Sequence, residues 1–149
     1  MTDVSPALER RRGLHGDGVF ARAAIARGAA VLTLGGPRIL PSEAVDELRC
    51  VQIGPGAYIG ESGGLDDYVN HACDPNLGFV EGTLTLVALR DIAAGDELSW
   101  DYSTAMNEPG WGFSCTCGGP SCRGRVTSFC DVDGDVQRRL RPIALAYLR

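Results

Sequence analysis

The stretch YVNHACDPN, residues 68–76, poses the central question of this sequence. His71 and Cys73 stand two positions apart in it, so a metal site, a nucleophile with its base, or an ordinary polar turn are all conceivable. Two positions on one short segment are a poor geometry for a nucleophile and its base, which argues against a hydrolase. The metal and turn interpretations stay open from this stretch alone.

A second motif, SCTCGGPSCRG, places Cys115, Cys117 and Cys122 in the pattern C-x-C-x4-C. Such a set suits Zn²⁺, which takes four ligands tetrahedrally in structural sites. The loop has almost no apolar core of its own, so the metal would supply its folding energy. A zinc deaminase is excluded, because its H-x-E and P-C-x-x-C motifs are absent. Five residues are candidates for the missing fourth ligand: Cys50, Cys73, Cys130, His15 and His71.

Length and charge narrow the class of protein. The 149 residues are enough for one domain with a small appendage. A net charge of −5 is unlike that of a nucleic-acid binder and predicts a basic partner, with no direct nucleic-acid contact. No apolar run approaches the roughly 18 residues of a membrane helix, so we expect no membrane association and a cytoplasmic location. There, six cysteines indicate metal ligands or thiols rather than disulfides.

Short apolar runs between turn residues predict a mainly β domain. We expect strands in GVFA, AAVLTLGG, CVQIG and AYIGE. The clearest hairpin covers residues 78–89, with Glu81-Gly82 at its turn. The segment RDIAAGDELSWDY turns at Ala94-Gly95 and ends in another strand, on which Trp100 and Tyr102 share a face.

Other segments are less regular. We expect a loose lead-in over residues 1–12 and one or two helical turns in PSEAVDEL, residues 41–48, capped by Ser42. The G-x-G of LHGDGVFA allows a close backbone approach to a ligand, but it is not the dinucleotide fingerprint. The tail DVQRRLRPIALAYLR predicts a helix interrupted at Pro142.

Four stretches, taken in order, resemble a SET-domain protein lysine methyltransferase of the small bacterial or viral type: HGDGVFA, YVNHACDPN, LRDIAAGDELSWDYS and CTCGGPSCRG. The last matches the zinc module that the family calls post-SET. The resemblance implies small curled β-sheets with a pseudo-knot, in which the N-H-x-C segment passes through a loop. It divides the chain into a lead-in (1–12), a SET domain (13–103), a post-SET zinc module (104–126) and a short C-terminal helical tail (127–149).

The resemblance also implies a site for S-adenosylmethionine (SAM), one structural Zn²⁺, and a lysine in a basic protein or peptide as the methyl acceptor. Tyr102 would be the catalytic residue that orients the amine. The cofactor residues would be His15, Gly16, Asp17, Gly18, Tyr58, Asn70, His71 and Met106. The channel for the lysine would have Tyr68, Phe79, Trp100 and Trp111 as walls. The metal ligands would be Cys73, Cys115, Cys117 and Cys122.

Two positions depart from the family pattern. Asp67 stands where relatives carry the arginine of R-F-I-N-H. The resemblance therefore does not predict how this position contacts the cofactor or packs in its loop. Trp100 stands where many relatives have Phe or Tyr, and its bulk predicts mono- or dimethylation. These departures keep an alternative open, a catalytically inactive, zinc-stabilised SET-like module that binds proteins. The insert region, residues 41–60, is short, so peptide recognition could use a second subunit, which leaves a homodimer open.

Overall fold

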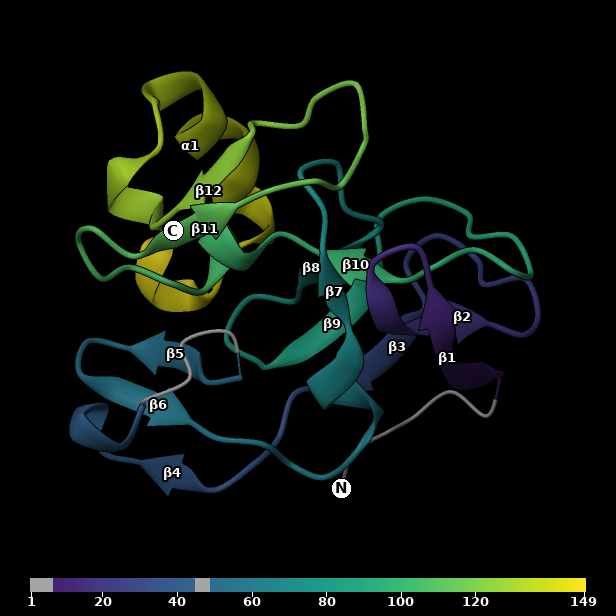
Figure 1. Ribbon diagram of the computed structural model, residues 1–149, viewed down its shortest axis with the longest axis horizontal. Helices are drawn as coiled ribbons and strands as arrows, with labels where there is room; N and C mark the ends of the chain where they lie inside the picture. The colour runs from purple at the N-terminus through teal and green to yellow at the C-terminus, as the bar shows by residue number, and fades with distance from the viewer. Residues whose placement is uncertain (1–6, 45–48) are drawn as a thin grey trace.

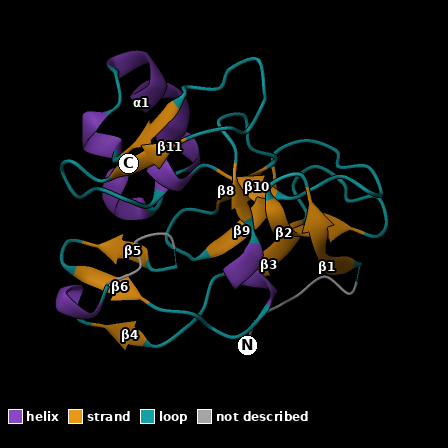
Figure 2. Cartoon of the chain, viewed as in Figure 1, coloured by secondary structure: helices purple, strands orange, loops and turns teal. Residues whose placement is uncertain are grey.

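The computed structural model describes residues 7–44 and 49–149. In these ranges the strands form five small sheets and a single α-helix lies near the C-terminus, which confirms the mainly β prediction (Figures 1 and 2). None of the helices described there is long and apolar enough to cross a membrane. The helical elements are α1 (Gly134–Leu140) and the 3-10 turns η1 (Pro41–Glu43), η2 (Leu65–Tyr68), η3 (Tyr102–Thr104), η4 (Phe129–Asp131), η5 (Arg141–Ile143) and η6 (Ala146–Leu148).

The chain enters the fold through an antiparallel hairpin of β1 (Leu8–Gly13) and β2 (Gly16–Ala21). Gly16 closes the turn with a φ of 85°, a conformation that glycine adopts without steric cost. The expectation of a loose lead-in is therefore wrong from Leu8 onward, while the first six residues lie outside the described part. Leu8 is the buried side chain of β1, so the strand shows no apolar alternation, and its register comes from pairing with β2.

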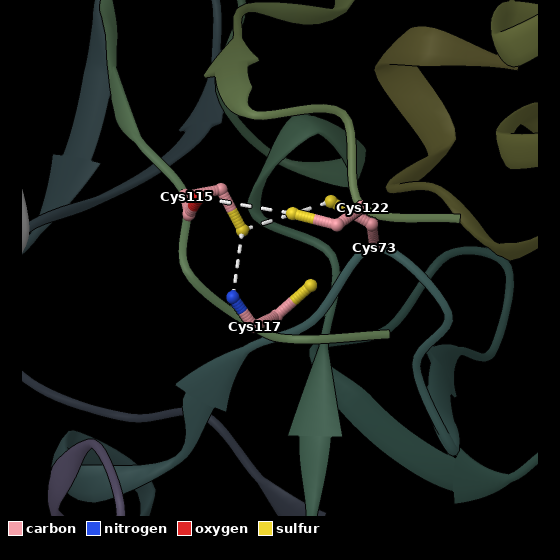
Figure 3. Close-up of side chains that lie close together, drawn as sticks. All are labelled: Cys73, Cys115, Cys117 and Cys122. Atoms are coloured by element: carbon pink, nitrogen blue, oxygen red, sulfur yellow. Dashed lines mark hydrogen bonds between the residues drawn. The ribbon is translucent and has the colours of Figure 1, made fainter. Parts of the chain in front are cut away.

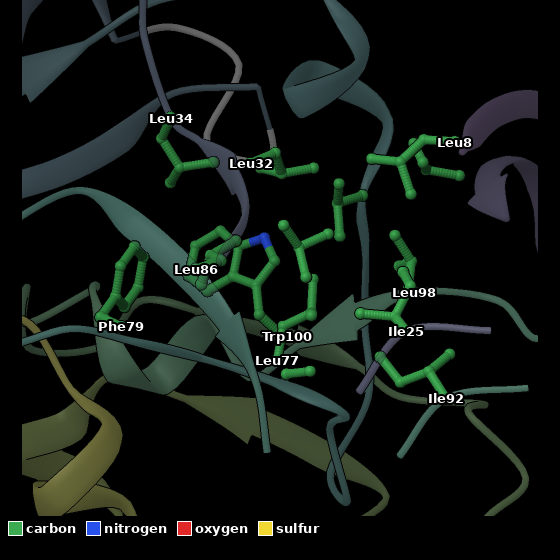
Figure 4. Close-up of a cluster of buried hydrophobic side chains, with 14 of the residues drawn as sticks. Leu8, Ile25, Leu32, Leu34, Leu77, Phe79, Leu86, Ile92, Leu98 and Trp100 are labelled. Atoms are coloured by element: carbon green, nitrogen blue, oxygen red, sulfur yellow. The ribbon is translucent and has the colours of Figure 1, made fainter. Parts of the chain in front are cut away.

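The central sheet has the order β3-β9-β8, with both pairs antiparallel. Its strands are β3 (Ala30–Thr33), β8 (Leu77–Phe79) and β9 (Thr85–Ala88). The predicted hairpin of residues 78–89 is confirmed, and Gly82 takes a φ of 76° at its turn. Side chains of this sheet converge on Trp100 in the main hydrophobic core (Figure 4).

A second sheet has the order β4-β6-β5. Its strands are β4 (Arg38–Ile39), β5 (Val51–Gly54) and β6 (Ala57–Ile59). Between β4 and β5, η1 supplies part of the predicted helical turn, while residues 45–48 lie outside the described part. Ser42 does not cap it, because the chain enters the turn at Leu40, whose N–H donates to Glu43 Oε2 at 2.6 Å. The acidic side chain thus provides the cap that Ser42 was expected to give.

Two very short strands hold the centre of the molecule. Strand β7 (Asn70–His71) pairs in parallel with β10 (Ser99–Trp100), so the N-H-x-C segment lies against the segment that leads to Tyr102. The predicted strand ends at Trp100, and Tyr102 begins η3 instead. The two rings are nevertheless neighbours, with centroids 4.6 Å apart.

The C-terminal third lies beside this centre (Figure 1). The Cys-rich segment contains a hairpin that the sequence did not predict, β11 (Gly112–Ser114) with β12 (Arg125–Thr127). Helix α1, capped by Asp133, gives way to η5 at Pro142, as expected. The last turn then packs behind η3, where the Leu145 N–H donates to Thr104 O at 2.9 Å.

Candidate active site and metal centre

Four cysteine side chains from two distant segments converge on one point (Figure 3). Cys73 follows β7, and the other three cysteines flank the Gly-Pro loop after β11. The four sulfur atoms all lie within 4.8 Å of one another, and Cys73 Sγ is 3.8 Å from Cys115 Sγ. Zn–S bonds of ~2.3 Å in a tetrahedron place sulfur atoms ~3.8 Å apart, whereas a disulfide needs ~2.05 Å. The set therefore fits a zinc ion and not a disulfide pair.

The thiols at this point are shielded from water. Cys73 is 1% exposed and Cys115 9% exposed. Burial raises the pKa of both thiols in the absence of a cation. The thiolate forms of Cys73 and Cys115 are therefore unfavourable here without a bound cation, and a metal would favour them strongly.

His71 joins the cysteine cluster to Tyr102. Its Nδ1 accepts a hydrogen bond of 3.0 Å from the Tyr102 N–H, and its Nε2 lies 3.4 Å from Cys73 Sγ. Burial lowers the pKa of His71 to about 4, so the ring is neutral at physiological pH. Because Nδ1 is the acceptor, the ring proton resides on Nε2 and points at the sulfur. His71 thus positions Tyr102 from one side and Cys73 from the other.

The hydroxyl of Tyr102 is fixed by the main chain of the neighbouring segment. It donates to Val69 O at 2.8 Å, and the ring is packed between Trp100 and Phe113. Burial, followed by the negative charge of Glu97, raises the pKa of Tyr102 well above its ordinary value. The hydroxyl therefore keeps its proton at neutral pH and retains oxygen lone pairs for a second hydrogen bond.

The G-x-G turn meets the N-H motif through Asn70. The Asn70 amide donates to Asp17 O at 3.0 Å and to Glu97 Oε1 at 2.8 Å. A Cβ atom on Gly18 would overlap the Glu97 carboxylate and lie 3.1 Å from the Asn70 amide nitrogen. A side chain at Gly18 would therefore have to displace the Glu97 carboxylate, while Gly16 is favoured by its positive φ.

A cleft of about 640 Å³ opens between the N-terminal hairpin and the Cys-rich loop. His15, Asp17, Asn70 and His71 line it together, as predicted for one ligand site, and so do Tyr68 and Tyr102. Across from them lie residues 113–117 of the Cys-rich segment. These walls also contain three arginines and one threonine that were not predicted from the sequence: Arg10, Arg12, Arg49 and Thr116.

A narrow channel, with a volume of about 30 Å³, adjoins the cleft and shares Arg49, Asp67 and Tyr102 with it. Trp100, Trp111 and Met106 line it, which brings together two of the predicted channel residues and one residue that was assigned to the cofactor. Tyr102 borders both the cleft and the channel.

Four predicted site residues do not line the site to which they were assigned, namely Tyr58, Met106, Phe79 and Tyr68, and the cleft walls do not include Gly16 or Gly18 either. Tyr58 and Met106 do not line the cleft; they pack with Trp111 in a second buried cluster. Phe79 is buried in the main core against Trp100, with ring centroids 5.3 Å apart. Tyr68 lies at the cleft, where the Arg10 guanidinium stacks 3.7 Å above its ring.

Asp67, which departs from the family pattern, closes the loop that precedes it. Its two carboxylate oxygens accept hydrogen bonds from the N–H groups of Ser62 at 2.8 Å and Gly63 at 2.7 Å. The side chain also borders both the cleft and the channel. The acidic side chain of Asp67 is therefore explained by these hydrogen bonds to the loop at residues 62–63.

A buried ion pair that sequence reasoning missed connects the Cys-rich segment to the tyrosine. The Arg123 guanidinium donates to both carboxylate oxygens of Asp101, at 2.7 and 3.0 Å. The Asp101 side chain is fully buried and that of Arg123 is 13% exposed. The pair joins the residue after Cys122, the last cysteine of the cluster, to the residue before Tyr102. The only signal in the sequence was position: Asp101 directly precedes Tyr102, and Arg123 directly follows Cys122.

Fold and site together define a SET-domain protein. The chain matches the SET domain family over residues 16–103, more than half of its length, and belongs to that family. Relatives include the Drosophila melanogaster histone-lysine N-methyltransferase ash1, which is 30% identical over 94% of this chain and 7% of its own. The H3 lysine-4 specific histone-lysine N-methyltransferase of Saccharomyces cerevisiae is 32% identical over 80% of this chain and 13% of its own. This chain thus spans a small part of those relatives.

A similar fold is seen in the crystal structure of KRYPTONITE in complex with mCHG DNA and SAH. The TM-score is 0.67 and the sequence identity 27%, over 80% of this chain and 29% of that one. The structural match agrees with the family assignment.

Proposed function

We propose that this chain transfers the methyl group of SAM to the ε-amine of a lysine in a basic protein or peptide. The observation that carries the proposal is the position of Tyr102, which borders both a large polar cleft and a narrow aromatic channel. Cofactor and lysine would approach from these two sides and meet at its hydroxyl. Holding both in one geometry is the main catalytic task, because orientation alone removes a large part of such a barrier.

The cleft suits the cofactor. Its volume of about 640 Å³ is within the usual range for small-molecule sites. His15, Asp17 and Asn70 would hold the cofactor from the hairpin side, and residues 114–117 would hold it from the Cys-rich side. SAM, when bound, supplies a methyl group already activated on a sulfonium. SAH in the complex of the structural relative supports this choice of cofactor.

The channel suits a lysine side chain. The amine must be neutral to attack, and its ordinary pKa is about 10.4. Trp100, Trp111 and Met106 are apolar members of walls that also contain Arg49, Asp66 and Asp67, and desolvation beside the apolar side chains would lower that pKa. A bound sulfonium charge would lower it further. The channel walls therefore assist both the orientation and the deprotonation of the amine.

Tyr102 would act as the orienting group. Its own proton is engaged by Val69 O, so its oxygen can accept a hydrogen bond from the amine N–H and direct the nitrogen lone pair at the methyl group. Because its pKa is raised, the hydroxyl stays neutral and does not remove the amine proton.

The four cysteines would hold one structural zinc ion. With all four positions taken by protein, no site is left for substrate, which is the pattern of a structural and not a catalytic metal. The ion would fix residues 114–117 over the cleft. We assign the Cys-rich segment to the post-SET type on this basis.

The relative named for H3 lysine-4 supports a basic tail as the substrate class, and the net charge of −5 favours such a tail. We also propose a cytoplasmic location, because six cysteines that form no disulfide in the described part of the chain suit a reducing compartment. We further propose that the chain contacts neither nucleic acid nor membrane, on the basis of its composition. A homodimer is proposed because the insert region, residues 41–60, is short.

Methyl transfer from labelled SAM to basic peptides and to histone-type proteins tests the proposal. The chain contains no lysine, so any methyl-lysine found by mass spectrometry belongs to the substrate. Tyr102→Phe removes the hydroxyl and retains the ring, and we expect it to lower kcat by about 10²-fold. Equal labelling by both proteins would contradict the role of Tyr102. SAM binding without transfer to any substrate would favour the inactive binding module.

A further inference from the structure

A second cavity lies beside the channel and has no role in methyl transfer as described above. Its volume is about 380 Å³, and it shares Cys50, Met106 and Trp111 with the channel. It does not border Tyr102, so it is not the route to the cofactor. A substrate whose target lysine fills the channel would place a neighbouring part of its chain at this cavity.

The walls of this cavity combine aromatic rings with a carboxylate. Tyr58 and Trp111 are each 6% exposed, whereas Glu108 is exposed to solvent. The Tyr58 hydroxyl donates to Glu108 Oε1 at 2.6 Å, and the Gln52 amide approaches the same oxygen at 3.4 Å. No described residue hydrogen-bonds the other oxygen, Oε2. The carboxylate is thus held in place with one oxygen available to a ligand.

Such a set of groups is suited to a cation on an alkyl chain. Aromatic faces attract cations through their quadrupole, and a fixed carboxylate adds a charge-assisted hydrogen bond. An arginine or lysine side chain satisfies both, because its stem is apolar and its end is charged. An acidic side chain would instead be repelled by Glu108.

Trp111 supplies a second, independent observation. Its Nε1 is fully buried, and no hydrogen-bond partner for it lies in the described part of the chain. A buried donor without a partner is rare and costs free energy, so an acceptor from outside the chain would be favoured. Trp111 borders both the channel and the cavity, so a small rotation of the ring on substrate binding would bring Nε1 to a peptide backbone carbonyl.

We propose that this cavity, the flank site of Tyr58, Glu108 and Trp111, binds a second cationic side chain of the substrate, an arginine or lysine close in sequence to the target lysine. The inference rests on the proposed function, since the channel is what places the target lysine. It adds a sequence preference that the methyl-transfer chemistry does not require.

The test uses a peptide library with one central lysine and varied flanking positions, methylated from SAM and sequenced by mass spectrometry. Wild-type protein should enrich arginine or lysine at one offset from the methylated residue. For a peptide chosen from that pool, replacing the flanking arginine with neutral citrulline should raise KM about fivefold to tenfold, with a smaller effect on kcat. Glu108→Gln keeps the Oε1 acceptor for Tyr58 but removes the charge, and it should reduce this ratio to less than twofold.

Glu81→Gln is the matched control, because Glu81 is an exposed acid at the β8–β9 turn and does not border the cavity. It should retain the full preference. Methylation with no preference for flanking cations, or a preference that Glu108→Gln leaves intact, overturns the flank site and leaves the proposed function standing. No methylation of any peptide by wild-type protein overturns the proposed function, and the flank site with it.

Discussion

Replacing Arg123 tests whether the Cys-rich segment and the catalytic segment form one unit. In Arg123→Met the stem stays apolar and similar in length, but both hydrogen bonds to Asp101 are lost. Asp101 is fully buried and would keep the Ser103 N–H, at 3.0 Å, as a donor. Removing one partner of a buried ion pair costs about 3–5 kcal/mol, because the other charge is left without compensation.

The matched control is Arg125→Met, two residues further along and exposed to solvent. We expect it to change the free energy of unfolding by about 0.5 kcal/mol or less. Urea unfolding of the zinc-loaded proteins gives both values, and the double variant Asp101→Asn with Arg123→Met measures the coupling. We expect the double variant to be more stable than Arg123→Met alone, since it no longer buries an unpaired carboxylate.

The same variant should also weaken catalysis. Asp101 precedes Tyr102, so loss of the ion pair would loosen the segment that places the hydroxyl, and we expect kcat to fall about tenfold or more. Equal free energies of unfolding for Arg123→Met and Arg125→Met, together with unchanged kcat, would refute the idea that the pair positions Tyr102.

Three further predictions follow from the same site. Cys73→Ser should release zinc and weaken SAM binding together, measured by metal analysis and calorimetry; full zinc occupancy in the variant would contradict the ligand assignment. Wild-type product should be mono- or dimethyl-lysine by mass spectrometry because Trp100 narrows the channel, and Trp100→Phe should shift it toward more methyl groups; a trimethylated wild-type product would be incompatible with this. Gly18→Ala should displace the Glu97 carboxylate from Asn70 and weaken SAM binding about tenfold by calorimetry, whereas unchanged affinity would show that the carboxylate moves at no cost.

Local sequence patterns predicted much of the fold. The hairpin of residues 78–89 and the break at Pro142 depend on neighbours in sequence, and both are confirmed. Strand β1 was missed because its side chains are almost all exposed, so its pairing with β2 left no apolar pattern. The β11–β12 hairpin was missed for a different reason. Its two strands are separated in sequence by the Gly-Pro loop, so no short turn signal joins them.

For the site, the sequence motifs predicted which residues meet at the cleft. They did not predict the hydrogen bonds and ion pairs that join those residues to one another. The Arg123–Asp101 pair and the His71–Cys73 contact join positions 22 and 2 residues apart, and no spacing rule predicts either. Tyr58 and Met106 line the cavity beside the channel, where the β4-β6-β5 sheet packs against the Cys-rich segment. This packing joins segments that are distant in sequence, so no local sequence pattern indicates it.

The contacts of Cys73 and Arg123 bear on any attempt to exchange parts between SET proteins. A Cys-rich segment grafted from a relative would still have to present an arginine to Asp101 and three thiols to Cys73. Chimeras cut between residues 103 and 115 should therefore fail unless these partners are transferred as a set. We therefore do not expect the boundary predicted between residues 103 and 104 to be a point at which the protein can be divided.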